Sequence, residues 1–192
     1  MTAGWVASTS RVQGTLMDGE AVRRSLSRIA HEIVERNKGV EHLVLVGVIN
    51  KGDTLAQRLA AILSRMEGRP VPFGRIDHVQ HRDDLHLRRR PAGGSRSQVP
   101  PIDGETVVLV DDVIWHGRTV RAAIDALLEF GRPRSIQLAV LVDRGHRELP
   151  IRPDYVGKNL PTARSEHVQV LLVEVDEEDA VLLERAEEAG DE

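Results

Sequence analysis

Three nearly continuous apolar runs constrain the fold of this chain more than any other feature. They lie at 42–48, 106–110 and 135–142, and valine, leucine and isoleucine dominate them with little polar alternation. A strand that is apolar on both faces must be covered on both faces, which is typical of a parallel sheet between two layers of helices. The runs therefore predict an α/β fold with a central parallel sheet.

The segments between the runs have the periodicity of helices. Asp18 is a suitable N-cap for a helix over 18–38, whose apolar residues recur on one face. Similar stripes predict helices over 55–66 and 120–128. Residues 71–80 are expected to form another strand, and 167–175 a fourth buried strand.

A chain of 192 residues is long enough for one domain with a sizeable core. We expect that domain to cover 15–180, with a flexible arm at 1–14 and an acidic tail at 181–192. Residues 82–105 are rich in Arg, Pro and Gly and lack periodicity, so they predict a long mobile loop. The stretch 176–189 is expected to be a short acidic helix or a frayed tail.

Composition excludes several classes of protein. The absence of cysteine excludes disulfide scaffolds, cysteine nucleophiles and thiolate metal sites, and it fits a cytoplasmic protein. No apolar run approaches the ~20 residues that cross a bilayer, and residues 1–20 lack the pattern of a secretion signal, so no membrane partner is expected. The eight histidines show no metal-ligand spacing, so a histidine-bound metal is not expected either.

Charge is unevenly distributed along the chain. The net charge is −4, but residues 174–192 hold ten acids and one base, which leaves 20 acids and 25 bases in the first 173 residues. The body is therefore mildly basic, and 23 of the 26 basic residues are arginine, whose planar side chain suits phosphate. A general bias towards arginine is the alternative explanation for most of them.

The richest chemistry lies where the run at 106–110 ends. Asp111 and Asp112 follow it directly, and a loop to Arg118 leads into the next helix. Ligands of open α/β sheets bind at the carboxyl ends of strands, and loop amides beside a helix N-terminus suit a monophosphate. Two adjacent carboxylates there suit the hydroxyls of a ribose, directly or through Mg²⁺. For the acid pair alone, a strand that ends in solvated acids is the simpler explanation.

The whole run 107–119 resembles the phosphoribosyl-diphosphate-binding motif of the type I phosphoribosyltransferases. The segments 141–152 and 154–159 narrow this likeness to the bacterial pyrimidine operon attenuator proteins with uracil phosphoribosyltransferase activity. It implies the type I phosphoribosyltransferase fold, a central parallel sheet with helices on both faces and a small hood. The likeness covers roughly 15–180, with shorter matches at 28–32, 36–39 and 82–85.

The resemblance implies two activities. One joins uracil to phosphoribosyl diphosphate, giving UMP and pyrophosphate, with Mg²⁺ on the pyrophosphate as cofactor. The other is binding to a stem-loop in the leader messenger RNA of pyrimidine operons when UMP or UTP is bound, which promotes transcription termination. A homodimer or a higher homo-oligomer is also implied.

The resemblance also implies roles for individual residues. The implied catalytic residues are Asp111, Asp112, Arg82 and Lys51, of which the two aspartates are also the candidate direct ligands of Mg²⁺. The implied substrate contacts are Asn50, Lys51, Gly52, Arg82, Asp111, Asp112, Val113, His116, Gly117, Arg118, Thr119, Arg144 and Val168. The implied RNA contacts are Ser27, Arg28, His31, Arg36, His146, Arg147, Arg152 and Lys158.

Three positions depart from the family pattern. Asn50-Lys51-Gly52 stands where the family has Thr-Arg-Gly, His116 replaces Thr or Ser, and His81 replaces Tyr. Lysine keeps the charge of arginine but lacks its planar pair of donors, and histidine titrates near neutral pH. Two alternatives therefore stay open. One is a nucleotide-sensing, RNA-binding regulator whose catalysis has decayed. The other is a purine phosphoribosyltransferase, which would share the acid-pair loop but leave the later segments unexplained.

Overall fold

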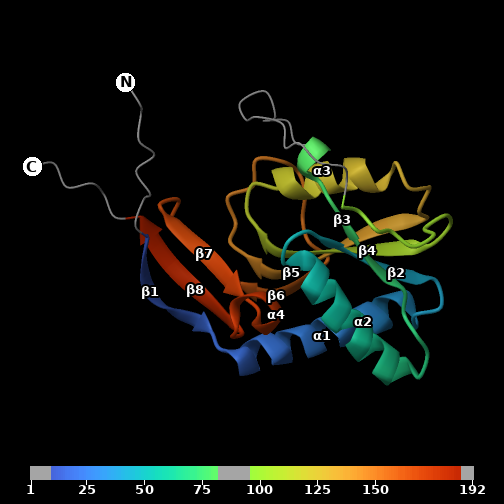
Figure 1. Cartoon of the computed structure of the whole chain (residues 1–192), viewed down its shortest axis with the longest axis horizontal. Helices are drawn as coiled ribbons and strands as arrows, with labels where there is room; N and C mark the ends of the chain where they lie inside the picture. The colour runs from blue at the N-terminus through green and yellow to red at the C-terminus, as the bar shows by residue number, and fades with distance from the viewer. Residues whose placement is uncertain (1–9, 82–95, 187–192) are drawn as a thin grey trace, which may run out of the picture.

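The computed structural model describes residues 10–81 and 96–186, which form a five-stranded parallel sheet and a smaller antiparallel sheet (Figure 1). The large sheet has the strand order β3-β2-β4-β5-β6. Its strands are β2 (Leu43–Val48), β3 (Phe73–Ile76), β4 (Thr106–Ile114), β5 (Ser135–Asp143) and β6 (Tyr155–Asn159). The helices that cover it are α1 (Gly19–Asn37), α2 (Gly52–Glu67) and α3 (Arg118–Leu127).

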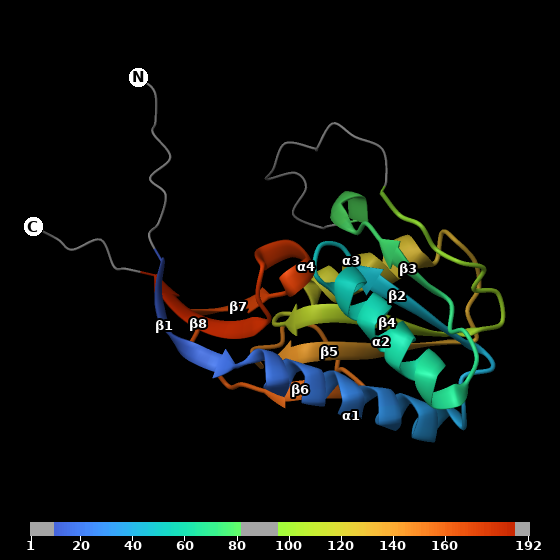
Figure 2. The same cartoon turned by 60° about the horizontal axis from the view of Figure 1, so that its bottom comes forward.

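The alternation of side chains along β2 explains why the sheet is covered on both faces. All six residues of β2 are buried. Leu43 and Leu45 pack with apolar side chains of α1 and α2, whereas Val44 and Val46 pack with those of α3. The helices α1 and α2 therefore lie on one face of the sheet and α3 on the other, as Figure 2 shows. This arrangement confirms the α/β fold predicted from the apolar runs.

The smaller sheet is a hood built from both ends of the described chain. Its strand order is β1-β8-β7. Its strands are β1 (Ser10–Met17), β7 (Glu166–Leu171) and β8 (Ala180–Ala186), and the short helix α4 (Val173–Asp176) connects β7 to β8. Because β7 contacts β4, the hood lies beside the strand that carries the acid pair.

Several predicted elements are wrong in place or type. The strand predicted at 167–175 pairs antiparallel with β8 in the hood, and β6, which was not predicted, takes the edge of the parallel sheet beside β5. Residues 180–186 form a strand where a helix or frayed tail was expected, and residues 10–14 are part of β1 rather than frayed. The two hood strands β1 and β8 come from opposite ends of the chain, so local patterns carry little information about their pairing.

The strand predicted at 71–80 is shorter than expected, since it covers only Phe73–Ile76. It ends at Ile76, and a single 3₁₀ turn follows over Val79–His81. The remaining parts of the predicted arm, loop and tail lie outside the described residues, at 1–9, 82–95 and 187–192. Within the part of the chain that is described, no helix has the length and apolarity needed to cross a membrane.

Candidate functional site

The acid pair lies at the carboxyl end of β4, within the strand itself. Pairing with β5 continues through Asp111 and Val140, so the loop that was expected to start at Asp111 begins only after Ile114. Asp111 is 5% exposed. Its Oδ1 accepts a hydrogen bond of 3.0 Å from the Asp112 backbone N–H, and Asp112 Oδ1 accepts one of 2.8 Å from the N–H of Val113. The sheet therefore holds both carboxylates in place.

The burial of this pair is electrostatically unfavourable. Burial raises the pKa of Asp111 well above its ordinary value of 3.8, and the neighbouring charge of Asp112 raises it further. Burial also raises the pKa of Asp112, although the N–H of Val113 and the charge of Lys51 act in the opposite direction. Because buried charges cost free energy unless they are paired, such a pair is typical of a site that receives a ligand.

Asp111→Asn is expected to stabilise the ligand-free protein near neutral pH by roughly 0.5–2 kcal/mol. The raised pKa of Asp111 means that folding takes up a proton above about pH 4, so the stability of the unaltered protein falls as the pH rises. Thermal unfolding measured from about pH 4 to 8 should therefore show the advantage of the variant growing with pH. An advantage that is equal at every pH would instead assign the effect to packing.

A tight turn joins the acid pair to α3. Gly117 is the N-cap of α3 and adopts a left-handed φ of 92°, where a side chain would be strained. The Arg121 N–H donates to the Gly117 carbonyl at 3.0 Å and so begins the helix. Because the first N–H groups of a helix have no partner within it, this N-terminus offers backbone donors to an anion. We call residues 115–119 the phosphate turn.

The acid pair and the phosphate turn line one cavity of about 390 Å³. The predicted site residues in its wall are Asp111, Asp112, Val113, His116, Gly117, Arg118, Thr119, Arg144 and Val168. Four lining residues were not predicted: Ile114, Trp115, Val120 and His167. Ile114 and Trp115 lie within the run 107–119 and Val120 follows it directly, so all three could have been found from the sequence. His167 belongs to the hood, and only the tertiary structure brings it to the cavity.

Arg144 reaches the cavity from the loop after β5. Its side chain is deeply buried, and burial lowers its pKa. Its Nε donates to Thr162 Oγ1 at 3.0 Å, and its guanidinium also donates to the carbonyl of Glu166 at 2.5 Å. The guanidinium carbon lies 4.3 Å from the centre of the Trp115 ring, a cation–π contact. A buried cation therefore lies against the phosphate turn.

The Asn50-Lys51-Gly52 turn lies against the acid pair. Gly52 begins α2, and a Cβ at this position would lie 2.3 Å from the carbonyl oxygen of Val110, so the close approach requires glycine. Lys51 is near enough to Asp112 for its charge to lower the pKa of that carboxyl. The structure thus brings Lys51 and Gly52 to the end of β4, and Asn50 is exposed on the same turn.

Five of the predicted RNA-binding residues lie on α1 and β6. Arg28 donates to the carbonyls of Val156 and Gly157, at 3.1 Å for Val156. Arg36 donates to Asp154 Oδ1 at 2.6 Å. These contacts hold the polar face of the helix beside the edge strand of the sheet. The members of this α1–β6 surface are Ser27, Arg28, His31, Arg36 and Lys158.

The other predicted RNA-binding residues lie on the loop after β5. The Arg147 side chain is 20% exposed, and it donates to the Trp115 carbonyl at 2.8 Å and to Asp143 Oδ2 at 2.6 Å. His146 is partly buried, whereas Arg152 is exposed. Arg147 thus ties its loop to the phosphate turn. The remaining predicted site residue, Arg82, lies outside the described residues.

Comparison with known proteins gives consistent results. The phosphoribosyl transferase domain family matches residues 12–177. The bifunctional protein PyrR of Brevibacillus brevis is 59% identical over 170 residues, which cover 88% of this chain and 95% of that protein. The protein of the same name from Deinococcus radiodurans is 56% identical over 172 residues, which cover 89% of this chain and 94% of that protein.

Solved structures share the same fold. The hypoxanthine phosphoribosyltransferase of Trypanosoma cruzi superposes with a TM-score of 0.68 at 21% identity, over 92% of this chain and 98% of that chain. A hypoxanthine-guanine phosphoribosyltransferase from Bacillus anthracis has a TM-score of 0.60 at 21% identity, over 80% of this chain and 85% of that chain. These two enzymes support the fold alone, whereas the 59% and 56% identities support closer kinship. The chain therefore belongs to the phosphoribosyltransferase family and, within it, to the bifunctional PyrR proteins.

Proposed function

We propose that this protein transfers the phosphoribosyl group of phosphoribosyl diphosphate to uracil, giving UMP and pyrophosphate. We propose further that UMP or UTP bound at the same site controls its binding to a stem-loop in pyrimidine-operon leader RNA, and so transcription attenuation. The observation that carries the proposal is the single cavity lined by both the acid pair and the phosphate turn. The similarity of nearly the whole chain to bifunctional PyrR proteins supports both activities.

The chemistry of the transfer suits this site. The ribose centre gains oxocarbenium character while pyrophosphate departs, so positioning and charge stabilisation supply most of the rate enhancement. Asp111 and Asp112 bind the ribose hydroxyls, and the amides of the phosphate turn bind the 5′-phosphate. Lys51 binds the departing pyrophosphate, and Val168, a buried residue of β7, gives the base an apolar wall. For Arg82, which lies outside the described residues, we propose a role in excluding water from the site during the reaction.

Mg²⁺ accompanies the pyrophosphate in this proposal. Residues 10–81 and 96–186 contain no group of three or more His, Asp or Glu side chains that could hold a metal. When Mg²⁺ is bound, the pyrophosphate oxygens would supply most of its ligands, as is usual for Mg²⁺ at phosphate sites. The carboxylates of Asp111 and Asp112 fit the ion, because a nearby cation offsets the cost of burying their charges.

The α1–β6 surface is the proposed RNA interface. A chain of net charge −4 needs its basic residues gathered on one surface to hold RNA, and this surface exposes Arg28, His31, Arg36 and Lys158. We propose that a homodimer or higher oligomer presents two copies of it to one stem-loop. Arg147 and its loop connect the phosphate turn with the start of β6, which gives nucleotide binding a route to this surface.

UMP formation from uracil and phosphoribosyl diphosphate, assayed with Mg²⁺, tests the enzymatic part. We expect turnover at an ordinary rate, on the order of 10 per second, with uracil and none with hypoxanthine. Turnover with hypoxanthine alone would favour a purine enzyme. UMP binding without turnover would favour a regulator with decayed catalysis.

In that case the double variant Lys51→Arg and His116→Thr should raise kcat more than it raises nucleotide affinity, because the added donors act on the transition state.

A further inference from the structure

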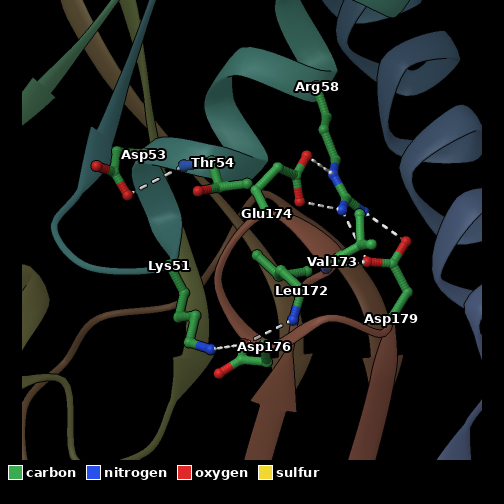
Figure 3. A network of polar contacts seen from close by, with 9 residues as sticks. All are labelled: Lys51, Asp53, Thr54, Arg58, Leu172, Val173, Glu174, Asp176 and Asp179. Atoms are coloured by element: carbon green, nitrogen blue, oxygen red, sulfur yellow. Dashed lines mark hydrogen bonds and ion pairs between the residues drawn. The ribbon is translucent and has the colours of Figure 1, made fainter.

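A network of ion pairs joins the hood to α2 and to the turn before it (Figure 3). Lys51 donates to the carboxylate of Asp176, the last residue of α4. On the first turns of α2, Arg58 donates to Glu174 through Nε at 2.9 Å and to Asp179 at 2.8 and 2.7 Å. The segment from α4 to β8 is therefore held by Arg58 of α2 and by Lys51, which directly precedes α2 and is a proposed substrate contact.

The contact at Lys51 is partly shielded from water. The side chains of Lys51 and Asp176 are 19% and 23% exposed. The bond to Lys51 lowers the pKa of Asp176, and so does a hydrogen bond of 2.9 Å from the Leu172 backbone N–H to Asp176 Oδ2. Asp176 therefore stays ionised at neutral pH, and it faces Lys51 from a fixed position at the end of α4.

The same lysine also lies close to the acid pair, although it is not one of the residues that line the cavity. Its charge lowers the pKa of Asp112, so the ammonium group lies within electrostatic reach of the acid pair. The ammonium of Lys51 has three N–H donors but only one positive charge, at the end of a flexible stem, and the ion pair with Asp176 draws that charge towards the hood. An oxygen of pyrophosphate that binds Lys51 must therefore draw the ammonium away from Asp176 or share its charge with that carboxylate.

We infer that Asp176 is a positioning residue that holds Lys51 while the site lacks pyrophosphate and takes Lys51 back as pyrophosphate leaves. The inference rests on the proposed function, because it assigns pyrophosphate to Lys51. Arg58 makes the exchange one-sided: it anchors Glu174 and Asp179, so α4 stays in place when Lys51 turns towards the cavity. Asp176 thus weakens pyrophosphate binding and favours release of the product.

A purely structural role for Asp176 is the competing explanation. In that case the ion pair would only fasten the hood, as the Arg58 pairs do, and its loss would lower stability without tightening pyrophosphate binding. Glu174 offers a matched control, since it lies on the same short helix, forms an ion pair with α2, and does not contact Lys51. Asp176→Asn keeps the shape of the side chain and an oxygen for the Leu172 N–H.

The test is the affinity of the full chain for magnesium pyrophosphate, measured by calorimetry without any turnover. Asp176→Asn should bind pyrophosphate roughly fivefold more tightly. This is the change in affinity expected when pyrophosphate no longer has to replace a partly exposed ion pair. UMP affinity should not change, because UMP carries no pyrophosphate, and Glu174→Gln should leave both affinities unchanged. In a Lys51→Met background, Asp176→Asn should have no effect on pyrophosphate.

Steady-state kinetics provide a second readout. If the full chain makes UMP, Asp176→Asn should lower the KM for phosphoribosyl diphosphate and strengthen product inhibition by pyrophosphate, with no gain in kcat. Pyrophosphate affinity that is unchanged or weaker in Asp176→Asn would overturn the inference. A missing uracil activity would instead refute the proposed function, and the direct binding comparison would still decide the role of Asp176.

Discussion

The double variant Asp111→Asn and Asp112→Asn is expected to weaken the binding of UMP and phosphoribosyl diphosphate by about 1.5–3 kcal/mol for each charged hydrogen bond that is lost. Both side chains line the cavity at the end of β4, where burial strengthens a hydrogen bond to a ribose hydroxyl. Calorimetric titration of the two ligands measures the loss. Turnover should fall by a similar or larger factor, because the ribose would no longer be held for reaction.

The same double variant should remain folded. The backbone N–H groups that bond to the two carboxylates can bond equally to the amide oxygens of asparagine. Circular dichroism checks this point. Asp125→Asn is a matched control, because Asp125 is an exposed acid of α3 that forms an ion pair with Arg121 outside the cavity. Unaltered UMP affinity in the double variant would contradict the assignment of the ribose site.

Arg28→Gln and Lys158→Gln are each expected to lower affinity for the leader stem-loop and to flatten its salt dependence. Both residues are exposed on the α1–β6 surface. Each lost phosphate contact should reduce the slope of log affinity against log salt by roughly 0.7–0.9. Titration of the RNA at several salt concentrations measures this slope. UMP synthesis should be almost unchanged, because neither residue lines the cavity.

Further variants separate this RNA surface from the nucleotide site. Arg121→Gln on α3, on the opposite face of the sheet, should bind RNA as the unaltered protein does.

Arg147→Gln should impair phosphoribosyl diphosphate binding as well as RNA binding, because Arg147 supports the carbonyl of Trp115. UMP or UTP should tighten RNA binding by about 1–3 kcal/mol. If Arg28→Gln and Lys158→Gln both leave the RNA affinity and its salt slope unchanged, the proposed RNA interface is wrong and only the proposed enzymatic activity stands.

The sequence alone was sufficient for the core of the fold and for the centre of the site. The apolar runs predicted strands that are buried on both faces. The burial of every residue of β2 confirms this prediction for that strand. Asp18 was predicted as a cap, and its carboxylate accepts the Ala21 N–H at 2.7 Å. The run 107–119 indicated a phosphate pocket, and its residues 111–119 line the cavity. These features depend on neighbouring residues, so local periodicity and motif spacing contain the necessary information.

Tertiary structure alone decided the hood and everything that depends on it. No local pattern shows that β1 pairs with β8, that β6 rather than β7 completes the large sheet, or that His167 reaches the cavity. The ion pair between Lys51 and Asp176 joins segments far apart in the chain. The partner of a strand is decided by side-chain packing against elements that are distant in the sequence. The surroundings of a charged side chain are likewise set by the fold, so neither can be inferred from adjacent residues.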